Sequence, residues 1–570
     1  MTQATSRAPG APTVLRLRAW QRAALDQFLA SPRPDFLAVA TPGAGKTTFA
    51  LTAARTMLAQ DPQTRLVVVA PTSHLKYQWA DSAARFGIDL EPNWSSSDGG
   101  LPDEVDGIVT TYQQVATSAA ALRKLCVDAF VVFDEVHHAG EDKAWGDAVT
   151  TAFERAGRRL ALSGTPFRSD SSPIPFVHYS GGDEAVADFD YGYGPALVDG
   201  GVVRPVYFPR FDGYMEWSAP DGMVISATFD DPLDRQRANQ RLRAALSPRG
   251  DWLPTVIGQA HEQLMRIRRD EQPRAGALAI AIDLEHARAI AELLRARHGV
   301  RATVALSDDP NASDRIAEFA AGDSPWIVAV RMVSEGVDIP RLRIGVFATT
   351  TTTELFFRQA VGRLVRLTPD GGSQRAFMFI PDDSRLRSWA EQIAQQRRHS
   401  LKRRAGDEDD DVIVHAEVDE VPDPADDSEQ LSLFDVLSAV TLSSGPPEMT
   451  VFDAAFEDVP PAPTSPAFDI AEHDLLLELT PLPGRSMRPQ TAGSTPRKER
   501  EALRDKNADV VAELVALTGK NHGQVNAELN RRSGVRSVAE AGRTQLRQRL
   551  EAAESWRREI SGHRSPWRVS

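Results

Sequence analysis

The chain has 570 residues, of which 42% are apolar, and this length fits two or three globular cores better than one. No apolar run approaches the roughly 20 residues of a membrane-spanning helix, and the first residues lack the apolar core of a secretory signal, so we expect a cytoplasmic protein. A net charge of −14 argues against a nucleic-acid partner, but residues 405–484 hold 21 acidic and no basic residues, and removing those 21 charges leaves +7 for the rest.

Residues 1–13 are expected to be disordered, and a regular pattern starts at residue 14. From there to residue 206, short apolar runs rich in β-branched residues alternate with amphipathic stretches, as in sheets of buried parallel strands. These runs are residues 35–40, 65–70, 107–111, 129–135 and 159–164. A second set lies at 277–282, 326–330 and 344–350. The pattern predicts an α/β fold with two doubly wound parallel-sheet domains in tandem.

The second domain is expected over residues 276–398, after a connecting region at 207–275. Residues 169–250 show no clear period, so the sequence leaves their structure open. Residues 405–495 combine acidic runs with proline, a composition typical of a disordered linker.

Residues 496–560 are expected to form a small basic helical module. From residue 496 to the last residue there are 16 Lys and Arg against 10 Asp and Glu, and residues 500–519 and 543–559 have helical spacing of their apolar positions. Lys520, Arg531, Arg532 and Arg536 cluster around an expected helix–turn–helix bend. This cluster favours DNA binding and a protein-docking unit about equally.

The stretch "FLAVATPGAGKTTFA" predicts a strand, a glycine-bearing loop and the start of a helix. Small residues let the backbone N–H groups of such a loop wrap phosphates, and the helix N-terminus adds partial positive charge. Lys46 would reach the β and γ phosphates of ATP, and Thr47 would bind Mg²⁺. Ala40 stands where this pattern usually has its first glycine. The expected nucleotide contacts here are Gly43, Ala44, Gly45, Lys46, Thr47 and Thr48.

A pair of carboxylates, Asp134 and Glu135, follows the apolar run "AFVVF". An acid at a strand end can hold the water shell of a metal, and its neighbour can orient or deprotonate an attacking water. We therefore expect Asp134 to serve Mg²⁺ together with Thr47, and Glu135 to be catalytic. A zinc site at His137 and His138 is the weaker alternative, because no third ligand stands at a suitable spacing.

The stretch "FRQAVGRLVR" places Arg363 and Arg366 three residues apart, on what should be one helix face. From the second domain, such a pair can supply arginine fingers to a γ-phosphate that the first domain binds. Taken alone, the stretch reads as a solvated helix face. Its order and spacing relative to the other two sites favour the catalytic interpretation.

With these three sites in order, the chain resembles the superfamily two helicases and translocases of the DExH type over about residues 15–398. The stretches "LRAWQRAAL", "APTSHLKYQW", "VTTYQQ", "LSGTPFR" and "SEGVDIP" are similar to five further motifs of that superfamily. "SGTPFR" together with "EGVDIP" looks closest to the XPB and restriction-translocase branch.

The resemblance implies two RecA-like domains that bind ATP and Mg²⁺ between them, with DNA across the top. It implies adenine reading by Gln21, coupling through Ser163 and Thr165, and a nucleotide site that includes Gly336 and Asp338. It also implies that Gln359 acts in one catalytic group with Arg363 and Arg366. Phosphate contacts of the nucleic acid are expected at Pro71, Thr72, Thr110 and Thr111.

The function expected from these features is that of an ATP-dependent DNA helicase in a bacterial or phage-infected cell. One alternative keeps the motor but makes it a duplex translocase without unwinding, or an RNA helicase. Another alternative, from a different class, is a nucleic-acid scaffold that does not hydrolyse ATP. The presence of Lys46, Glu135 and Arg363 disfavours it, because a pure binder has no need of all three.

Within the acidic linker, "QLSLF" is an apolar cluster that resembles the pentapeptide with which bacterial replication and repair proteins bind the sliding clamp. Gln430 offers an amide, Leu431 adds apolar surface, and Leu433 with Phe434 can fill a pocket. The alternative is a chance apolar cluster or a transient helix. We expect the clamp as a second partner beside DNA.

Overall fold

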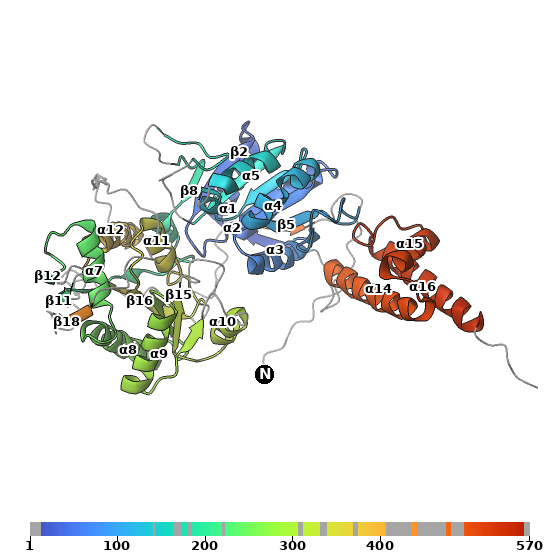
Figure 1. Ribbon diagram of the computed structural model, residues 1–570. Coiled ribbons are helices and arrows are strands. Elements are labelled where there is room, and N and C mark those ends of the chain that lie inside the picture. Colours follow the sequence, from blue (N-terminus) through green and yellow to red (C-terminus); the bar gives the residue numbers. More distant parts are fainter. Residues whose placement is uncertain are drawn as a thin grey trace, which may run out of the picture.

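The computed structural model describes residues 13–140, 143–164, 173–180, 185–218, 223–305, 312–330, 339–368, 374–405, 435–441, 475–479 and 495–563. Figure 1 shows two α/β lobes next to each other and a helical module beside the first lobe. Within these ranges, no helix combines the length and the hydropathy needed to cross a membrane.

The first lobe is built on a parallel sheet with the strand order β4-β5-β3-β6-β7-β2-β8. Its strands are β2 (Asp35–Ala40), β3 (Leu66–Ala70), β4 (Leu90–Glu91), β5 (Gly107–Thr111), β6 (Phe130–Phe133), β7 (Arg158–Ser163) and β8 (Phe189–Tyr191). The five runs predicted from the sequence are β2, β3, β5, β6 and β7, so this part of the fold prediction is confirmed.

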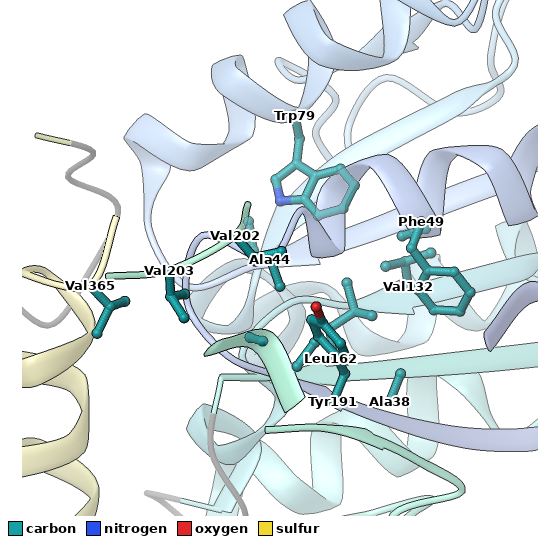
Figure 2. Close-up of a cluster of buried hydrophobic side chains, with 14 of the residues drawn as sticks. Ala38, Ala44, Phe49, Trp79, Val132, Leu162, Tyr191, Val202, Val203 and Val365 are labelled. Atoms are coloured by element: carbon teal, nitrogen blue, oxygen red, sulfur yellow. The ribbon is translucent and has the colours of Figure 1, made fainter. Parts of the chain in front are cut away.

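Helices cover both faces of this sheet. Successive residues of a strand point to opposite faces, so a buried strand contributes apolar side chains to a core on each side. Ala38 packs in one cluster with Phe49 and Trp79 (Figure 2), whereas Val39 packs in another with Tyr112 and Val149. The first face carries α1 (Ala19–Ala30), α2 (Lys46–Gln60) and α3 (Ser73–Arg85). The second carries α4 (Tyr112–Leu125), the 3-10 turn η1 (Val136–Gly140) and α5 (Lys143–Phe153).

The second lobe is also a parallel sheet, with the order β10-β17-β16-β13-β15-β14 and with β9 beside β17. Its strands are β9 (Val206–Tyr207), β10 (Arg210–Phe211), β13 (Gly276–Ala281), β14 (Thr303–Ala305), β15 (Trp326–Val330), β16 (Leu342–Ala348) and β17 (Ala376–Pro381). Its helices are α7 (Arg235–Ala245), α8 (Trp252–Asp270), α9 (Leu284–His298), α10 (Ala312–Ala321), α11 (Glu354–Gly362) and α12 (Ser384–Ala405). The two tandem doubly wound domains expected from the sequence are therefore present.

The stretch that the sequence left open supplies parts of both lobes. After β8 comes α6 (Tyr193–Asp199), and then β9 and β10, which extend the sheet of the second lobe. Next, β11 (Gly213–Ser218) and β12 (Val224–Thr228) form an antiparallel pair. Strands as short as these give no clear periodic signal in a sequence.

The range expected to be a disordered linker contains two strands that the structure describes. Residues Asp435–Thr441 form β18, which pairs antiparallel with β11 as the third strand of that small sheet. Residues Leu475–Leu479 form β19, which pairs antiparallel with β1 (Thr13–Leu17). Each strand satisfies the backbone groups of an otherwise open edge. The prediction of a disordered linker over residues 405–495 is therefore wrong for these two strands.

The basic helical module consists of α14 (Pro496–Thr518), α15 (His522–Ser533) and α16 (Arg543–His563). The three helices pack around a small apolar core that includes Leu514, Leu529 and Trp556. The two helices predicted from the sequence are α14 and α16. In Figure 1 the module lies beside α3 of the first lobe.

Arginines of α14 dock the module on the first lobe. Arg500 is fully buried and its guanidinium binds the carboxylate of Asp89, and Arg504 Nη1 lies 3.0 Å from Oε2 of Glu91. Arg497 Nη2 lies 2.7 Å from Oδ1 of Asp81, a residue of α3. Part of the positive charge of the module thus forms ion pairs with the first lobe. DNA contact by the exposed Lys520 and Arg536 stays a prediction.

We expect Arg500→Ala to weaken this docking by about 3 kcal/mol, because removing one partner of a buried ion pair leaves the other uncompensated. The matched control is Arg531→Ala, since Arg531 pairs with Glu528 but has a side chain that is 75% exposed, and such pairs contribute about 0.5 kcal/mol or less. Hydrogen exchange along α14 and thermal unfolding report the difference. Equal behaviour of the two variants would show that Arg500 does not hold the module.

Candidate nucleotide-binding site

The expected phosphate loop, metal carboxylate and coupling serine lie at the same edge of the first sheet. Strands β6, β7 and β2 are adjacent and parallel, so their carboxyl ends meet there. The loop follows β2, Asp134 and Glu135 follow β6, and Ser163 ends β7 in register with Val39 of β2. Ligands of open α/β sheets bind at this edge.

The phosphate loop has the backbone conformation that its glycines allow. Gly43 and Gly45 have φ angles of +82° and +96°, a region that L side chains rarely adopt, and α2 begins at Lys46. Ala40 is not among the residues with positive φ and is the last residue of β2. Alanine therefore replaces the usual glycine without backbone strain.

Three side chains from the start of α1 hold the carbonyls of the loop. Arg18 Nη1 donates to the Ala44 carbonyl at 2.7 Å, and Trp20 Nε1 donates to the same oxygen at 3.2 Å. Gln21 is buried and its Nε2 donates to the Gly45 carbonyl at 3.0 Å. Sequence reasoning missed Arg18 and Trp20, whose only signal was their place next to Gln21. Adenine reading by Gln21 stays a prediction, and in this structure Gln21 fixes the loop.

Lys46 and Glu135 form an ion pair at the centre of the site. Lys46 Nζ lies 3.1 Å from Oε1 of Glu135 and 3.3 Å from the Ala40 carbonyl. Oε2 of Glu135 accepts a hydrogen bond from the N–H of Gly164 at 3.1 Å. The φ of Glu135 is +47°, which is unusual for a residue with a side chain and is typical of functional positions.

The side chain of Asp134, which follows β6, is held by Trp79 of α3. Its Oδ2 accepts a hydrogen bond from Trp79 Nε1 of α3 at 2.8 Å. Burial and the charge of Glu135 raise the pKa of Asp134 to about 6. Burial alone would also raise the pKa of Glu135, but the charges of Lys46 and His137 and the bonds from Lys46 and Gly164 lower it to about 2. The two neighbouring carboxyls therefore differ in proton affinity, as catalytic pairs often do.

Thr47 and Asp134 fit the role of magnesium ligands. A hydroxyl in the first turn of α2 and a carboxylate at the end of β6 are hard oxygen donors on adjacent parts of one edge. Asp134 is half-buried, and its burial together with the charge of Glu135 raises its pKa, so a positive charge beside it would favour its charged form. A divalent cation held there would supply such a charge and would neutralise charge on the phosphates. Thr48 lies in the same half-buried first turn.

The second lobe reaches this site through the segment 359–366. The amide Nε2 of Gln359 lies 3.1 Å from Nε2 of His137, across the two lobes. A methyl group added at Gly362 would lie 2.6 Å from Cγ of Pro42, and one added at Gly43 would lie 3.1 Å from Cγ of Arg366. Backbone and side chains of this segment thus contact the phosphate loop directly.

The two arginines do not share a helix face, contrary to the sequence expectation. Helix α11 ends at Gly362, Arg363 is its C-cap, and Arg366 forms an isolated antiparallel bridge with Val203. The chain leaves the helix because it pairs with the extended segment before β9. The stem of Arg366 thereby lies over Gly43, while Arg363 is half-buried at the helix end.

Several expected site residues lie outside the described residues. They are Thr165, Gly336, Asp338, Gln430, Leu431, Leu433 and Phe434. Their roles stay predictions.

The residues expected to contact nucleic-acid phosphates lie at the ends of two neighbouring strands. Pro71 and Thr72 follow β3, and Thr110 and Thr111 end β5, which pairs with β3. Helices α3 and α4 begin at this place, so two positive helix ends face the same edge. The Thr111 hydroxyl caps α4 and Thr110 is buried, whereas Pro71 and Thr72 are half-buried. Phosphate contact at these residues stays a prediction.

The chain matches a known family model over its first lobe. The ResIII model, described as "Type III restriction enzyme, res subunit", matches residues 14–168. A DNA 3'-5' translocase, XPB2 of Sulfurisphaera tokodaii, is 24% identical over 381 residues, which are 62% of this chain and 79% of that protein.

Two solved structures cover about two thirds of the chain. The Type ISP restriction-modification enzyme LlaBIII bound to DNA is 16% identical, with a TM-score of 0.46, over 67% of this chain and 30% of its own. A fragment of an HsdR subunit of a type I restriction enzyme from Vibrio vulnificus is 17% identical, with a TM-score of 0.46, over 65% of each chain.

Relatives that match nearly the whole chain come from mycobacteria. An uncharacterized protein of Mycobacterium tuberculosis is 39% identical over 96% of this chain and 93% of its own length, and one of Mycobacterium leprae is 38% identical over 96% and 94%. The chain belongs to the family of these mycobacterial proteins, and residues 14–168 of its first lobe match the ResIII model.

Proposed function

We propose that this protein is an ATP-driven motor that moves along DNA and separates its strands. ATP binds between the lobes, where Lys46 meets the β and γ phosphates and Glu135 acts on the attacking water. Arg363 and Arg366 stabilise the charge that develops in the transition state, and Thr47 and Asp134 hold Mg²⁺.

The observation that carries the proposal is the meeting of three chain segments at one place. Lys46 pairs with Glu135 at 3.1 Å, Gln359 reaches His137 at 3.1 Å, and the Arg366 stem lies over Gly43. The residues that would act on a γ-phosphate thus come from both lobes, which supports a coupling between hydrolysis and movement of the lobes. A pure nucleic-acid scaffold has no need of this arrangement.

DNA is the proposed track. One relative, XPB2, carries the name of a DNA translocase, and residues 14–168 match a restriction-enzyme family model. The two helix N-termini behind Thr72 and Thr111 offer backbone N–H groups, which suit a motor because they hold phosphates of any sequence.

The decisive experiment measures ATP turnover alone and with single-stranded DNA, duplex DNA or RNA. We expect stimulation by DNA over RNA. No hydrolysis under any condition would leave the scaffold as the function, and stimulation by RNA alone would make the protein an RNA helicase. Strand-displacement and triplex-displacement assays then separate unwinding from duplex translocation, since a translocase without unwinding displaces only the triplex strand.

We also propose that the segment Gln430–Phe434 binds the bacterial sliding clamp. The next residues, Asp435–Thr441, form β18 and pair with β11 on the second lobe. The segment is therefore joined directly to a strand of the motor, so a clamp bound there would lie close to the second lobe.

We expect a peptide of residues 426–437 to bind the clamp, and the double change Leu433→Ala with Phe434→Ala to cost about 2 kcal/mol or more, as at other hot-spot residues. Titration calorimetry with the peptide and with the full chain measures this. The matched control is Leu437→Ala, because Leu437 is 54% exposed on β18, outside the pentapeptide. No binding by the native peptide and the full chain would remove the clamp as a partner.

A further inference from the structure

The segment between the two sheets runs along the nucleotide site. This connector, residues 192–205, leaves β8 of the first lobe and enters β9 of the second. Val202 and Val203 are buried, and Figure 2 shows them between Ala44 of the phosphate loop and Val365. One apolar cluster therefore joins the phosphate loop, the connector and the segment 359–366 of the second lobe.

The main chain of the connector pairs with that same segment. Val203 forms an antiparallel bridge with Arg366, and the N–H of Arg204 donates to the Val365 carbonyl at 2.6 Å. The connector thus holds the backbone at Val365 and Arg366, and the stem of Arg366 lies over Gly43.

The side chain of Arg204 makes a second attachment. It is fully buried, and its Nη2 and Nη1 donate to the carbonyls of Pro340 and Leu342 at 2.8 and 3.2 Å. Pro340 is the last residue of the stretch "SEGVDIP", which the resemblance assigned to the nucleotide site, and Leu342 lies two residues beyond it. Burial, and then the charge of Arg343, lower the pKa of Arg204 to about 9, so the guanidinium is still charged at neutral pH. Burying a charge is costly, and the planar fork of arginine suits two carbonyls at once.

We propose that Arg204 is a positioning residue that couples the connector to the segment 359–366 and to residues 340–342 of the second lobe. Its N–H holds the segment with Arg366, and its guanidinium holds the carbonyls of Pro340 and Leu342. Through these bonds it keeps Arg366 at the phosphate loop when the lobes are together. The inference rests on the proposed function, because it concerns ATP turnover.

The test compares Arg204→Met, Arg204→Lys and the control Arg241→Met in the full chain. Arg241 is also a buried arginine of the second lobe that donates to carbonyls, but these belong to Thr228 and Asp231, outside the connector, the segment 359–366 and residues 340–342. We expect Arg204→Met to lower kcat for ATP about 10- to 100-fold with KM little changed, because small displacements of a catalytic group act on the transition state. Arg204→Lys keeps the charge and some donors, and should recover part of kcat.

The control should lose thermal stability and keep its kcat below its unfolding temperature. Hydrogen exchange in peptides 202–206 and 361–366 should rise in Arg204→Met and not in Arg241→Met, a readout that needs no activity. If wild-type protein does not hydrolyse ATP, the proposed function fails, while the exchange data still test the coupling. If wild type hydrolyses ATP and the folded Arg204→Met protein keeps its kcat, or if both methionine variants lose kcat alike, the role of Arg204 as a positioning residue is refuted. If Arg204→Met does not fold, Arg204→Lys decides in the same way, by its kcat and its exchange.

Discussion

Lys46→Ala is expected to abolish ATP hydrolysis while the protein remains folded. Lys46 begins α2 behind two glycines with left-handed backbone, so its ammonium is the cation placed where the phosphates would bind. Removing one preorganised charge at such a site costs a factor of about 10²–10³ or more in rate. The loop backbone is held independently by Arg18 and Trp20, so we expect little loss of structure.

Phosphate release and the affinity for a fluorescent nucleotide measure this prediction together. The matched control is Lys124→Ala, which removes an exposed lysine of α4 in the same lobe and should leave turnover unchanged. Hydrolysis at the wild-type rate by Lys46→Ala would exclude the loop as the catalytic phosphate site. Loss of thermal stability well beyond that of the control would instead make Lys46 a structural partner of Glu135.

The features that the sequence predicted depend on local patterns. The stretch around Lys46 that predicts a strand, a glycine loop and the start of a helix has 15 consecutive residues, and each buried parallel strand is a short apolar run. Asp134 and Glu135 follow such a run directly. Chain order then brings these ends to one edge, because parallel strands of one sheet share their carboxyl side.

The features that the sequence missed depend on contacts between distant residues. Trp79 and Asp134 are 55 positions apart, and Arg500 meets Asp89 across 411 positions. No period or spacing links such pairs. The departure of Arg366 from the helix had one local signal, Gly362, since glycine is common where helices end. The helical spacing of the two arginines outweighed that signal. The sequence therefore predicted a helix that continues past Gly362, whereas in the structure it ends there.

β18 shows that composition is also an incomplete guide to structure. Acidic and proline-rich surroundings indicate disorder, but seven residues suffice to complete an open sheet edge. Ala439 is buried there, and its carbonyl accepts a hydrogen bond from the Asp251 N–H at 2.8 Å. This strand is stabilised by its pairing with β11, and the composition of a segment does not show which strand it will pair with.

Glu135→Gln is expected to bind ATP and to turn over very slowly. The pKa of Glu135 is lowered to about 2, because Lys46, His137 and the Gly164 N–H outweigh its burial, so the carboxylate is charged throughout the neutral range. Glutamine keeps the shape and can still accept the Gly164 hydrogen bond, but it can neither take a proton nor offset Lys46. Lys46 then remains fully available to the phosphates, so we expect nucleotide affinity to be kept or increased.

The expected loss in turnover is about 10²–10⁴-fold, the usual contribution of a general base. Glu154→Gln is the matched control, because Glu154 is a partly exposed carboxylate of the same lobe that pairs with Arg123 at the surface. Single-turnover hydrolysis and nucleotide titration separate chemistry from binding. Wild-type turnover in Glu135→Gln would exclude the base role. Equal losses of affinity and turnover would show that the charge mainly orders the loop through Lys46, and the water would then have to be activated by another group at this edge.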